Sequence, residues 1–246
     1  MTRLPPNPWT DLPTRGAKVA VADRPYVEAF NATLADRKGG DRFALHTELM
    51  PEPFMGDPAR AQVLLLQLNP GFVVDDVDAH ADWRFRQRAR ANLVHSAEYP
   101  VFLLDPALDR VPGWQWWHRA TGPLRRAVTD RIGDPEEALR CLAAGLMVVE
   151  FHGYHSSGYR QLPVTLPSQT YGFALVERAI ERGTPILIGR GEAIWKVAVP
   201  ALDRPRAAVT LTNRQRTSIS PANLDGDGKG DRRFAGIVDR ICNGGR

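Results

Sequence analysis

The segment LLLQLNPGF (residues 64–72) decides the fold expected for this chain. The apolar run that ends within this segment covers residues 62–68. It is short, continuous and bounded by turn residues, as in a buried strand of a parallel sheet. The run stops at Asn69-Pro70-Gly71, where proline and glycine favour a tight turn and glycine lets a ligand approach the backbone closely. The amide of Asn69 is therefore a candidate functional group at the end of a strand.

Three further apolar runs are predicted strands, at residues 146–151, 185–189 and 207–212. Between and around them, helical spacing of apolar residues predicts helices at 24–36, 113–128, 135–145, 171–183 and 232–243. Strands that alternate with helices indicate an α/β protein, with three layers (α/β/α) around a central, mostly parallel four-stranded sheet. We expect a single domain over 1–246, with a helical lead-in at 1–60 and an inserted loop or lid at 72–98.

The composition is that of a globular protein, with 43% hydrophobic and 24% charged residues among 246. No apolar run approaches the roughly 20 residues that span a bilayer, and the first residues do not resemble a signal peptide. The two cysteines, Cys141 and Cys242, form neither a disulfide framework nor a cysteine metal cluster. These features predict a cytoplasmic monomer without membrane contact.

Arginines are concentrated in two segments of this mildly basic chain, which has a net charge of +4. The first segment, WRFRQRAR, holds Arg84, Arg86, Arg88 and Arg90, and the second, NRQRTS, holds Arg214 and Arg216. Such clusters suit a polyanion, so DNA is the expected partner. The alternative is a solvated helix face without a partner.

In α/β sheets ligands bind at the carboxyl ends of strands, where three polar loops are expected: LNPGF, EFHGYHSSGY and TNRQRTSISPANL. Two of them carry a resemblance. LNPG (residues 68–71) after the first strand and SISP (residues 218–221) after the last resemble the two motifs of the uracil-DNA glycosylase superfamily. The resemblance covers residue 60 to the end of the chain. It implies an enzyme that flips a base out of DNA and hydrolyses its N-glycosidic bond.

The resemblance also implies roles for individual residues. Asn69 would orient the attacking water, and Phe72 would stack on the flipped base. Ser218 stands where the family's best-known second motif has a histidine that stabilises the leaving base, so Arg214 or Arg216 would have to compensate. Ser220 would contact a phosphate. Leu224 is the expected wedge that fills the gap left by the base, in a segment that also offers Ala222 and Asn223.

Glu150 occupies the position where the uracil-specific branch has an asparagine that reads the base. An ionised carboxylate only accepts hydrogen bonds, so it suits the N4 amine of cytosine and repels O4 of uracil. His152 and Tyr154 are further candidates for base contacts, and His155 lies beside them. Other interpretations stay open for Glu150: a general base, an ion pair with an arginine, or a metal site with the two histidines. We expect no metal and no other cofactor.

The sequence therefore predicts a monofunctional DNA glycosylase that acts on a modified pyrimidine. Because an enzyme that removed normal cytosine would destroy its own genome, hydroxymethylated or glucosylated cytosine in phage DNA is favoured. No lysine is placed for Schiff-base chemistry, and two cysteines cannot hold an iron–sulfur cluster. The alternatives are a uracil or mismatch repair glycosylase, a non-catalytic DNA-binding protein of the same fold, and an unrelated α/β enzyme of nucleotides or sugars.

Overall fold

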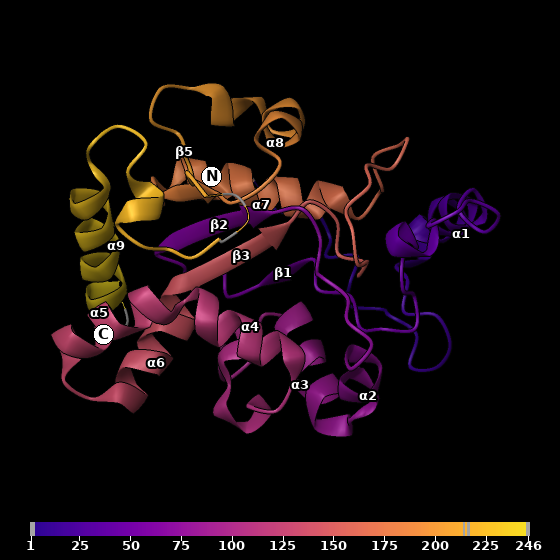
Figure 1. Cartoon of the computed structure of the whole chain (residues 1–246), viewed down its shortest axis with the longest axis horizontal. Coiled ribbons are helices and arrows are strands. Elements are labelled where there is room, and N and C mark those ends of the chain that lie inside the picture. Colours follow the sequence, from indigo (N-terminus) through magenta and orange to yellow (C-terminus); the bar gives the residue numbers. More distant parts are fainter. Residues whose placement is uncertain (1–2, 214, 216, 245–246) are drawn as a thin grey trace.

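The centre of the molecule is a sheet with the strand order β1-β3-β2-β4-β5 (Figure 1). A computed structural model describes residues 3–213, 215 and 217–244. Four strands are parallel: β2 (Val63–Gln67), β3 (Leu146–Glu150), β4 (Ile186–Ile188) and β5 (Val209–Thr210). They lie within the four predicted apolar runs, and this confirms the α/β class with a mostly parallel sheet.

The sheet has a fifth strand that the sequence analysis missed. Strand β1 (Phe54–Met55) pairs antiparallel with β3, so that Phe54 faces Val149 across the ladder. Two residues are too few to show an alternating pattern, so this part of the chain was predicted to be only a helical lead-in. The segment 1–60 also contains α1 (Arg24–Ala32), which is shorter than the predicted helix 24–36.

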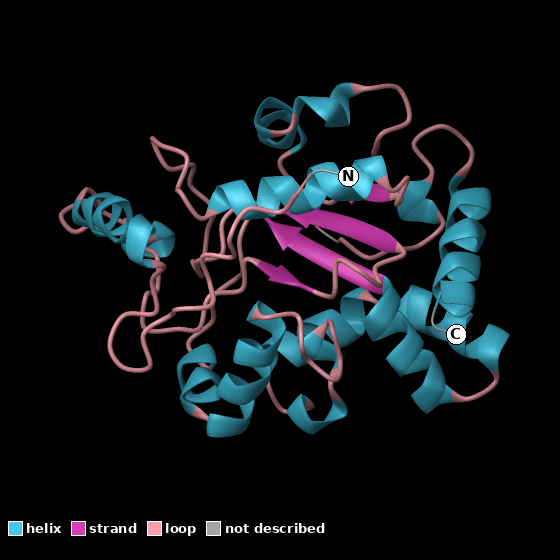
Figure 2. Ribbon diagram, turned by 180° about the vertical axis from the view of Figure 1, so that it is seen from behind, coloured by secondary structure: helices cyan, strands magenta, loops and turns pink. Residues whose placement is uncertain are grey.

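Helices cover both faces of the sheet (Figures 1 and 2). One face carries α7 (Gln169–Glu181), and α8 (Glu192–Ala198) lies beside it through contact of Trp195 with Phe173. The other face is covered by α3 (Trp83–Leu93), α4 (Pro112–Ala120), α5 (Gly122–Ile132), α6 (Pro135–Gly145) and α9 (Gly230–Gly244). Helix α9 packs on α5 and α6. The three layers of the prediction are present.

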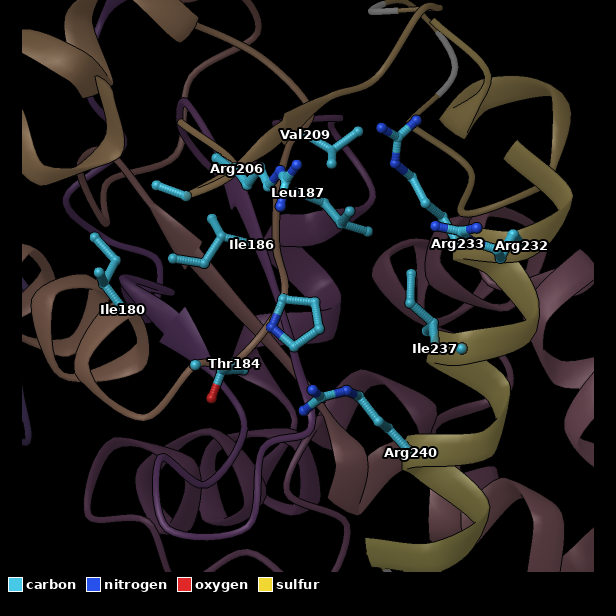
Figure 3. A pocket seen from close by; sticks show the side chains of 15 residues that line it. Ile180, Thr184, Ile186, Leu187, Arg206, Val209, Arg232, Arg233, Ile237 and Arg240 are labelled. Atoms are coloured by element: carbon cyan, nitrogen blue, oxygen red, sulfur yellow. The ribbon is translucent and has the colours of Figure 1, made fainter. Parts of the chain in front are cut away.

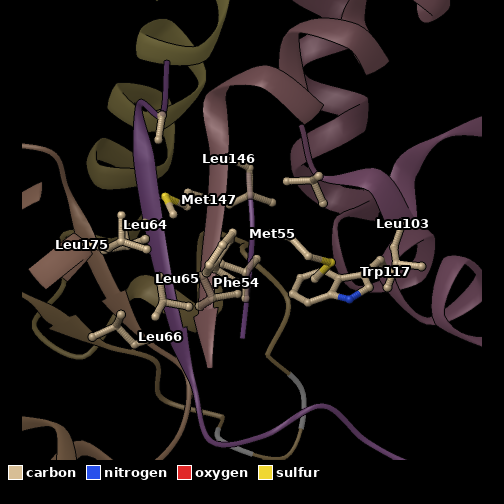
Figure 4. Close-up of a cluster of buried hydrophobic side chains, with 14 of the residues drawn as sticks. Phe54, Met55, Leu64, Leu65, Leu66, Leu103, Trp117, Leu146, Met147 and Leu175 are labelled. Carbon is tan, nitrogen blue, oxygen red and sulfur yellow. The ribbon is translucent and has the colours of Figure 1, made fainter. Parts of the chain in front are cut away.

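The predicted helix 113–128 is two helices, α4 and α5, which meet at Thr121. Pro123 lies in the first turn of α5, where its missing N–H costs nothing, whereas within one continuous helix it would break a hydrogen bond. The break turns Trp117 into the core, where it is 5% exposed. Figure 4 shows Trp117 beside Met55 and Leu103.

The hydrophobic core extends from the sheet into residues 1–60 and 72–98, where no strand was predicted. Figure 4 shows Phe54 and Met55 packed with Leu65 and Leu146 of the central strands. The segment 72–98 is not a loop, because it forms α2 (Asp76–Ala81) and α3, and α3 buries Phe85, Ala89 and Leu93. Residues 1–60 and 72–98 are thus integral to the fold. Among the described residues, no helix is long and apolar enough to cross a membrane.

Candidate functional site

The chain leaves β2 toward β3 on one side and reaches β4 on the other, so the direction of winding reverses at β2. In open α/β sheets, ligands bind outside the carboxyl ends of the strands at such a point. A pocket of about 540 Å³ lies there. It is lined by residues that follow or end three strands, among them Gln67, Asn69, Glu150 and Arg190.

Gln67 and Glu150, the last residues of β2 and β3, are paired in the sheet register. Both are buried, at 5% and 8% exposure, and both line the pocket. Gln67 Nε2 and Glu150 Oε2 have no hydrogen-bond partner among the described residues. Directly after the neighbouring strand β4, a Cβ atom at Gly189 would lie only 2.9 Å from Gln67 Nε2, so glycine leaves space for the amide. Buried polar atoms without partners are uncommon, and here they mark a place for a ligand.

Burial raises the pKa of Glu150 to about 8, while the positive charge of Arg190 opposes that rise. At neutral pH the carboxyl group is therefore mostly protonated, and it both donates and accepts hydrogen bonds. This corrects the sequence argument, which treated Glu150 as ionised and able only to accept. A neutral carboxyl group suits cytosine and does not repel O4 of uracil.

Asn69 lies at the pocket with its amide nitrogen already engaged. Nδ2 donates to Ser156 Oγ at 2.9 Å and to the carbonyl oxygen of Pro70 at 2.9 Å. No described group binds Asn69 Oδ1, so the side chain presents a fixed acceptor. A held acceptor of this kind can orient a water molecule or a hydroxyl group.

The turn that carries Asn69 is tied to the loop after β3. The backbone N–H of Ser156 donates to Pro70 O at 3.2 Å, and His155 Nδ1 donates to Gly71 O at 2.7 Å. Phe72, also at the pocket, stacks on His46 with ring centroids 3.6 Å apart. These contacts hold the turn and its aromatic ring in place before any ligand arrives.

A cluster of Glu52, His80 and His155 lies on another wall of the same pocket. Among the described residues, these three side chains place potential metal-ligand atoms within 4.8 Å of one another. Glu52 Oε1 is 3.9 Å from His80 Nε2 and 3.8 Å from His155 Nε2. The N–H of Met50 donates to His80 Nδ1, so the proton of a neutral His80 sits on Nε2, the nitrogen that an ion would need.

Burial lowers the pKa of His155 to about 4 and that of His80 well below its ordinary value, so both rings are neutral at pH 7. Burial and the charges of Asp76 and Glu150 raise the pKa of Glu52. Neutral rings can bind a metal, but His155 Nε2 lies 3.0 Å from Met50 O and His80 Nε2 carries the proton of its ring, so the cluster fits a set of hydrogen-bonding groups better than a metal centre.

The chemistry of the pocket changes from its interior to its mouth. The buried carboxyl groups of Glu52, Asp76 and Glu150 line the interior, together with Tyr159, whose buried hydroxyl has no partner among the described residues. Exposed arginines stand at the rim: Arg42, Arg119 and Arg190. An anionic backbone outside and a group with hydrogen-bond donors inside would match this distribution.

The SISP segment does not line the pocket. Ser218 and Ser220 are half-buried, and their carbonyl groups accept hydrogen bonds from Asn223 within their own loop. Leu224, the expected wedge, is 0% exposed and belongs to the core, so it cannot enter DNA without unfolding its surroundings. Arg214 and Arg216 lie outside the described residues.

Two of the predicted base contacts are core residues instead. Tyr154 is 1% exposed, and its hydroxyl donates to Asp23 Oδ2 at 2.7 Å. His152 is buried beside Tyr159 and does not line the pocket, and burial lowers its pKa to about 3. Tyr154 is held by Trp9 and Asp23 of the N-terminal segment, and His152 stacks on Tyr159 within its own loop.

The arginine cluster of α3 divides into exposed and structural members. Arg84 and Arg86 are exposed, and Arg84 lies over the ring of Trp83. Arg88 forms an ion pair with Asp105, and Arg90 donates to Pro13 O at 3.2 Å. Of the four arginines in this cluster, Arg84 and Arg86 are thus the two available for the contacts to DNA phosphates that the sequence predicts.

Several pocket residues were not among the site residues predicted from the sequence. Glu52 precedes β1, His80 lies in α2, and Trp116 and Arg119 lie in α4. Only Gln67 carried a signal, as the single polar residue inside the apolar run 62–68 after its first position. Comparisons with protein-family models, curated proteins and solved structures find no match for this chain.

Proposed function

We propose that the protein is a DNA glycosylase that hydrolyses the N-glycosidic bond of a modified pyrimidine, favoured to be hydroxymethylated or glucosylated cytosine in phage DNA, and leaves an abasic site. The observation that carries this proposal is the pair of unpartnered buried groups, Gln67 Nε2 and Glu150 Oε2, at the strand ends next to Asn69. A flipped base presents its hydrogen-bonding edge, and an amide beside a carboxyl group can satisfy that edge.

The reaction needs two groups on opposite sides of the bond that breaks. Water must reach the sugar carbon as positive charge develops there, and Asn69 Oδ1 is a held acceptor for it. The departing base carries negative charge, and the protonated Glu150 donates a hydrogen bond or its proton to the base as the bond breaks. In this account Glu150 replaces the motif histidine that the chain lacks, and Ser218 has no catalytic role.

The remainder of the pocket supports a base that carries a substituent. At about 540 Å³ the pocket lies within the range of pockets for drug-sized ligands and exceeds a snug fit around one bare base. Beyond Glu150, its walls offer Asp76, His80 and Trp116. Carboxyl and imidazole groups hydrogen-bond to hydroxyls, and the indole offers a flat apolar face. Hydroxymethyl and hexose groups have matching chemistry.

DNA would contact the rim of the pocket. Arg42, Arg119 and Arg190 are positioned to bind the phosphates on either side of the flipped nucleotide. Exposed Arg84 and Arg86 extend the basic surface. The stacked pair of Phe72 and His46 offers an aromatic face at the entrance.

A uracil repair glycosylase is the second proposal, and the neutral state of Glu150 favours it. A protonated carboxyl group donates to O4 of uracil and accepts from N3–H, so it binds uracil as well as cytosine.

The test is incubation of the protein with DNA that carries uracil, cytosine, hydroxymethylcytosine or glucosylated hydroxymethylcytosine, followed by alkaline cleavage of abasic sites. Cleavage restricted to modified cytosine supports the first proposal, and cleavage at uracil supports the second. The absence of abasic sites on every substrate would reject both.

A further inference from the structure

A second cavity lies at the opposite edge of the sheet, where β4 and β5 begin (Figure 3). Its volume is about 370 Å³. It is bounded by the turn 183–185, by the segment 206–209 and by α9. None of its lining residues belongs to the pocket that contains Glu150.

The floor of this cavity is aliphatic. Ile186, Leu187, Val209 and Ile237 line it, and Figure 3 shows these side chains grouped around the strand ends. The lining offers one side-chain hydroxyl, that of Thr184. The flat face of a ring can therefore lie on this floor. The floor has no side chains that would recognise the hydrogen-bonding groups at the edge of the ring.

The rim of the cavity carries four arginines, Arg206, Arg232, Arg233 and Arg240, and no carboxylate lines it. Arg233 is paired with Asp227. Among the described residues, no acidic partner is found for the other three. In Figure 3, Arg240 reaches from α9 toward the cavity, and Arg206 lies on the opposite side of it.

The backbone of Arg206 supports a binding role for this rim. Its φ angle is +65°, in the left-handed region that side chains other than glycine rarely adopt. Such strain persists where the surroundings impose it, and it is concentrated at binding sites. Here it places Arg206 at the edge of the cavity.

We propose that this cavity binds a nucleoside phosphate, with the base on the aliphatic floor and the phosphates on the arginine rim. Guanidinium groups form paired hydrogen bonds with phosphate oxygens, and several cations that converge without carboxylates suit a polyanionic group more than a single carboxylate. The aliphatic floor provides space for a base in addition to the phosphates. This site is independent of the proposed glycosylase activity.

The experiment is calorimetric titration of the full chain with adenosine triphosphate, adenosine and inorganic pyrophosphate. We expect the triphosphate to bind most tightly, because each of the other two probes offers only part of the ligand. Arg206→Gln and Arg240→Gln should each weaken its binding about tenfold, since each removes charge-assisted hydrogen bonds. Arg110→Gln, which changes an exposed arginine outside this rim, should leave binding unchanged.

Gly236→Leu tests the floor without removing a charge. A Cβ atom added at Gly236 meets no atom within 4 Å, so the start of a leucine side chain has space there, at a position that lines the cavity. We expect this variant to lose the triphosphate with a melting temperature no lower than that of the wild type, because leucine is a better helix former than glycine inside α9. Equal binding of pyrophosphate and triphosphate, with no effect of Gly236→Leu, would overturn the role of the floor.

Two further outcomes would overturn the site as a whole. One is the absence of triphosphate binding. This outcome counts against the site even if a single-stranded oligonucleotide binds through the same arginines. The other is binding that Arg119→Gln abolishes and the rim variants leave intact, because that result would place the nucleotide in the pocket of Glu150.

Discussion

Gln67 and Glu150 face each other across the parallel strands β2 and β3, and each ends in a buried polar atom without a partner among the described residues. Leaving such atoms unsatisfied costs about 1–3 kcal/mol each. A ligand that supplies the missing hydrogen bonds would recover this free energy. The pair therefore connects the end of the sheet to the proposed recognition of a base.

The protonation state of Glu150 predicts the pH dependence of the proposed glycosylase activity. Since its pKa is about 8, the acid form that would assist the leaving base in the proposed reaction predominates below that pH and is lost above it. We expect kcat/KM for abasic-site formation to fall as the pH rises through about 8. Glu150→Gln should remove this alkaline decrease and retain base binding, with kcat reduced at least 100-fold because an amide cannot transfer the proton.

The same pKa predicts how stability depends on pH. The pKa of Glu150 rises from 4.5 to about 8 on burial, so its contribution to stability is complete below about 4.5 and decreases as the pH rises to about 8. Glu150→Gln has no group to ionise and should therefore be more stable than the wild type at pH 9 by more than about 1 kcal/mol. Denaturant unfolding at pH 4 and pH 9 measures this difference. An equal difference at both values would contradict the assignment.

Asn69 should be important for the proposed activity, and its partner Ser156 should affect the activity by positioning Asn69. Asn69→Ala removes the acceptor for water, and we expect a loss of about 100-fold in kcat with little change in KM. Ser156→Ala removes the 2.9 Å bond to Asn69 Nδ2, so a smaller loss in kcat should accompany a decrease in unfolding free energy of about 1 kcal/mol. If Ser156→Ala changed stability and left kcat intact, the positioning role would be wrong.

The salt dependence of the proposed DNA binding should distinguish arginines that contact phosphates from arginines with a structural role. Arg119→Gln and Arg84→Gln each remove an exposed cation, so the slope of log K against log salt should decrease by about 1 for each phosphate that is no longer neutralised. Arg88→Gln breaks the ion pair with Asp105. It should lower the melting temperature and leave the slope unchanged. Fluorescence anisotropy with labelled DNA over a salt series measures the slope, and thermal unfolding measures the melting temperature.

Leu224 should behave as a core residue and not as a wedge. Leu224→Ala removes a side chain with 0% exposure and should lower the free energy of unfolding by about 2–5 kcal/mol. Ala222 in the same turn is exposed, and Ala222→Ser should be neutral for stability. A Leu224→Ala protein of unchanged stability with a specific defect in base flipping would restore the original prediction.

The sequence predicted the parallel strands and most helices because buried strands and amphipathic helices leave periodic apolar patterns. It placed Asn69, Phe72 and Glu150 at the strand ends, and the structure brings all three to one pocket. Glu52 and His80 could not be found in this way, because their place depends on a two-residue strand and a short helix, α2.

Protonation was equally inaccessible to sequence reasoning. The neutral state of Glu150 depends on burial in the folded chain, where its backbone N–H donates to Pro53 O of the N-terminal segment. The roles expected of Tyr154 and Leu224 failed for the same reason, since polarity and loop position do not reveal tertiary packing.

The most direct test of the central claim is mass spectrometry of a single-turnover reaction on DNA with one glucosylated hydroxymethylcytosine. The wild type should release the free modified base and leave an intact strand with one abasic site. Asn69→Ala should bind the same DNA and release the base about 100-fold more slowly. An unchanged oligonucleotide after incubation with the folded wild type, across the cytosine and uracil substrates, would contradict the proposal that this pocket breaks an N-glycosidic bond.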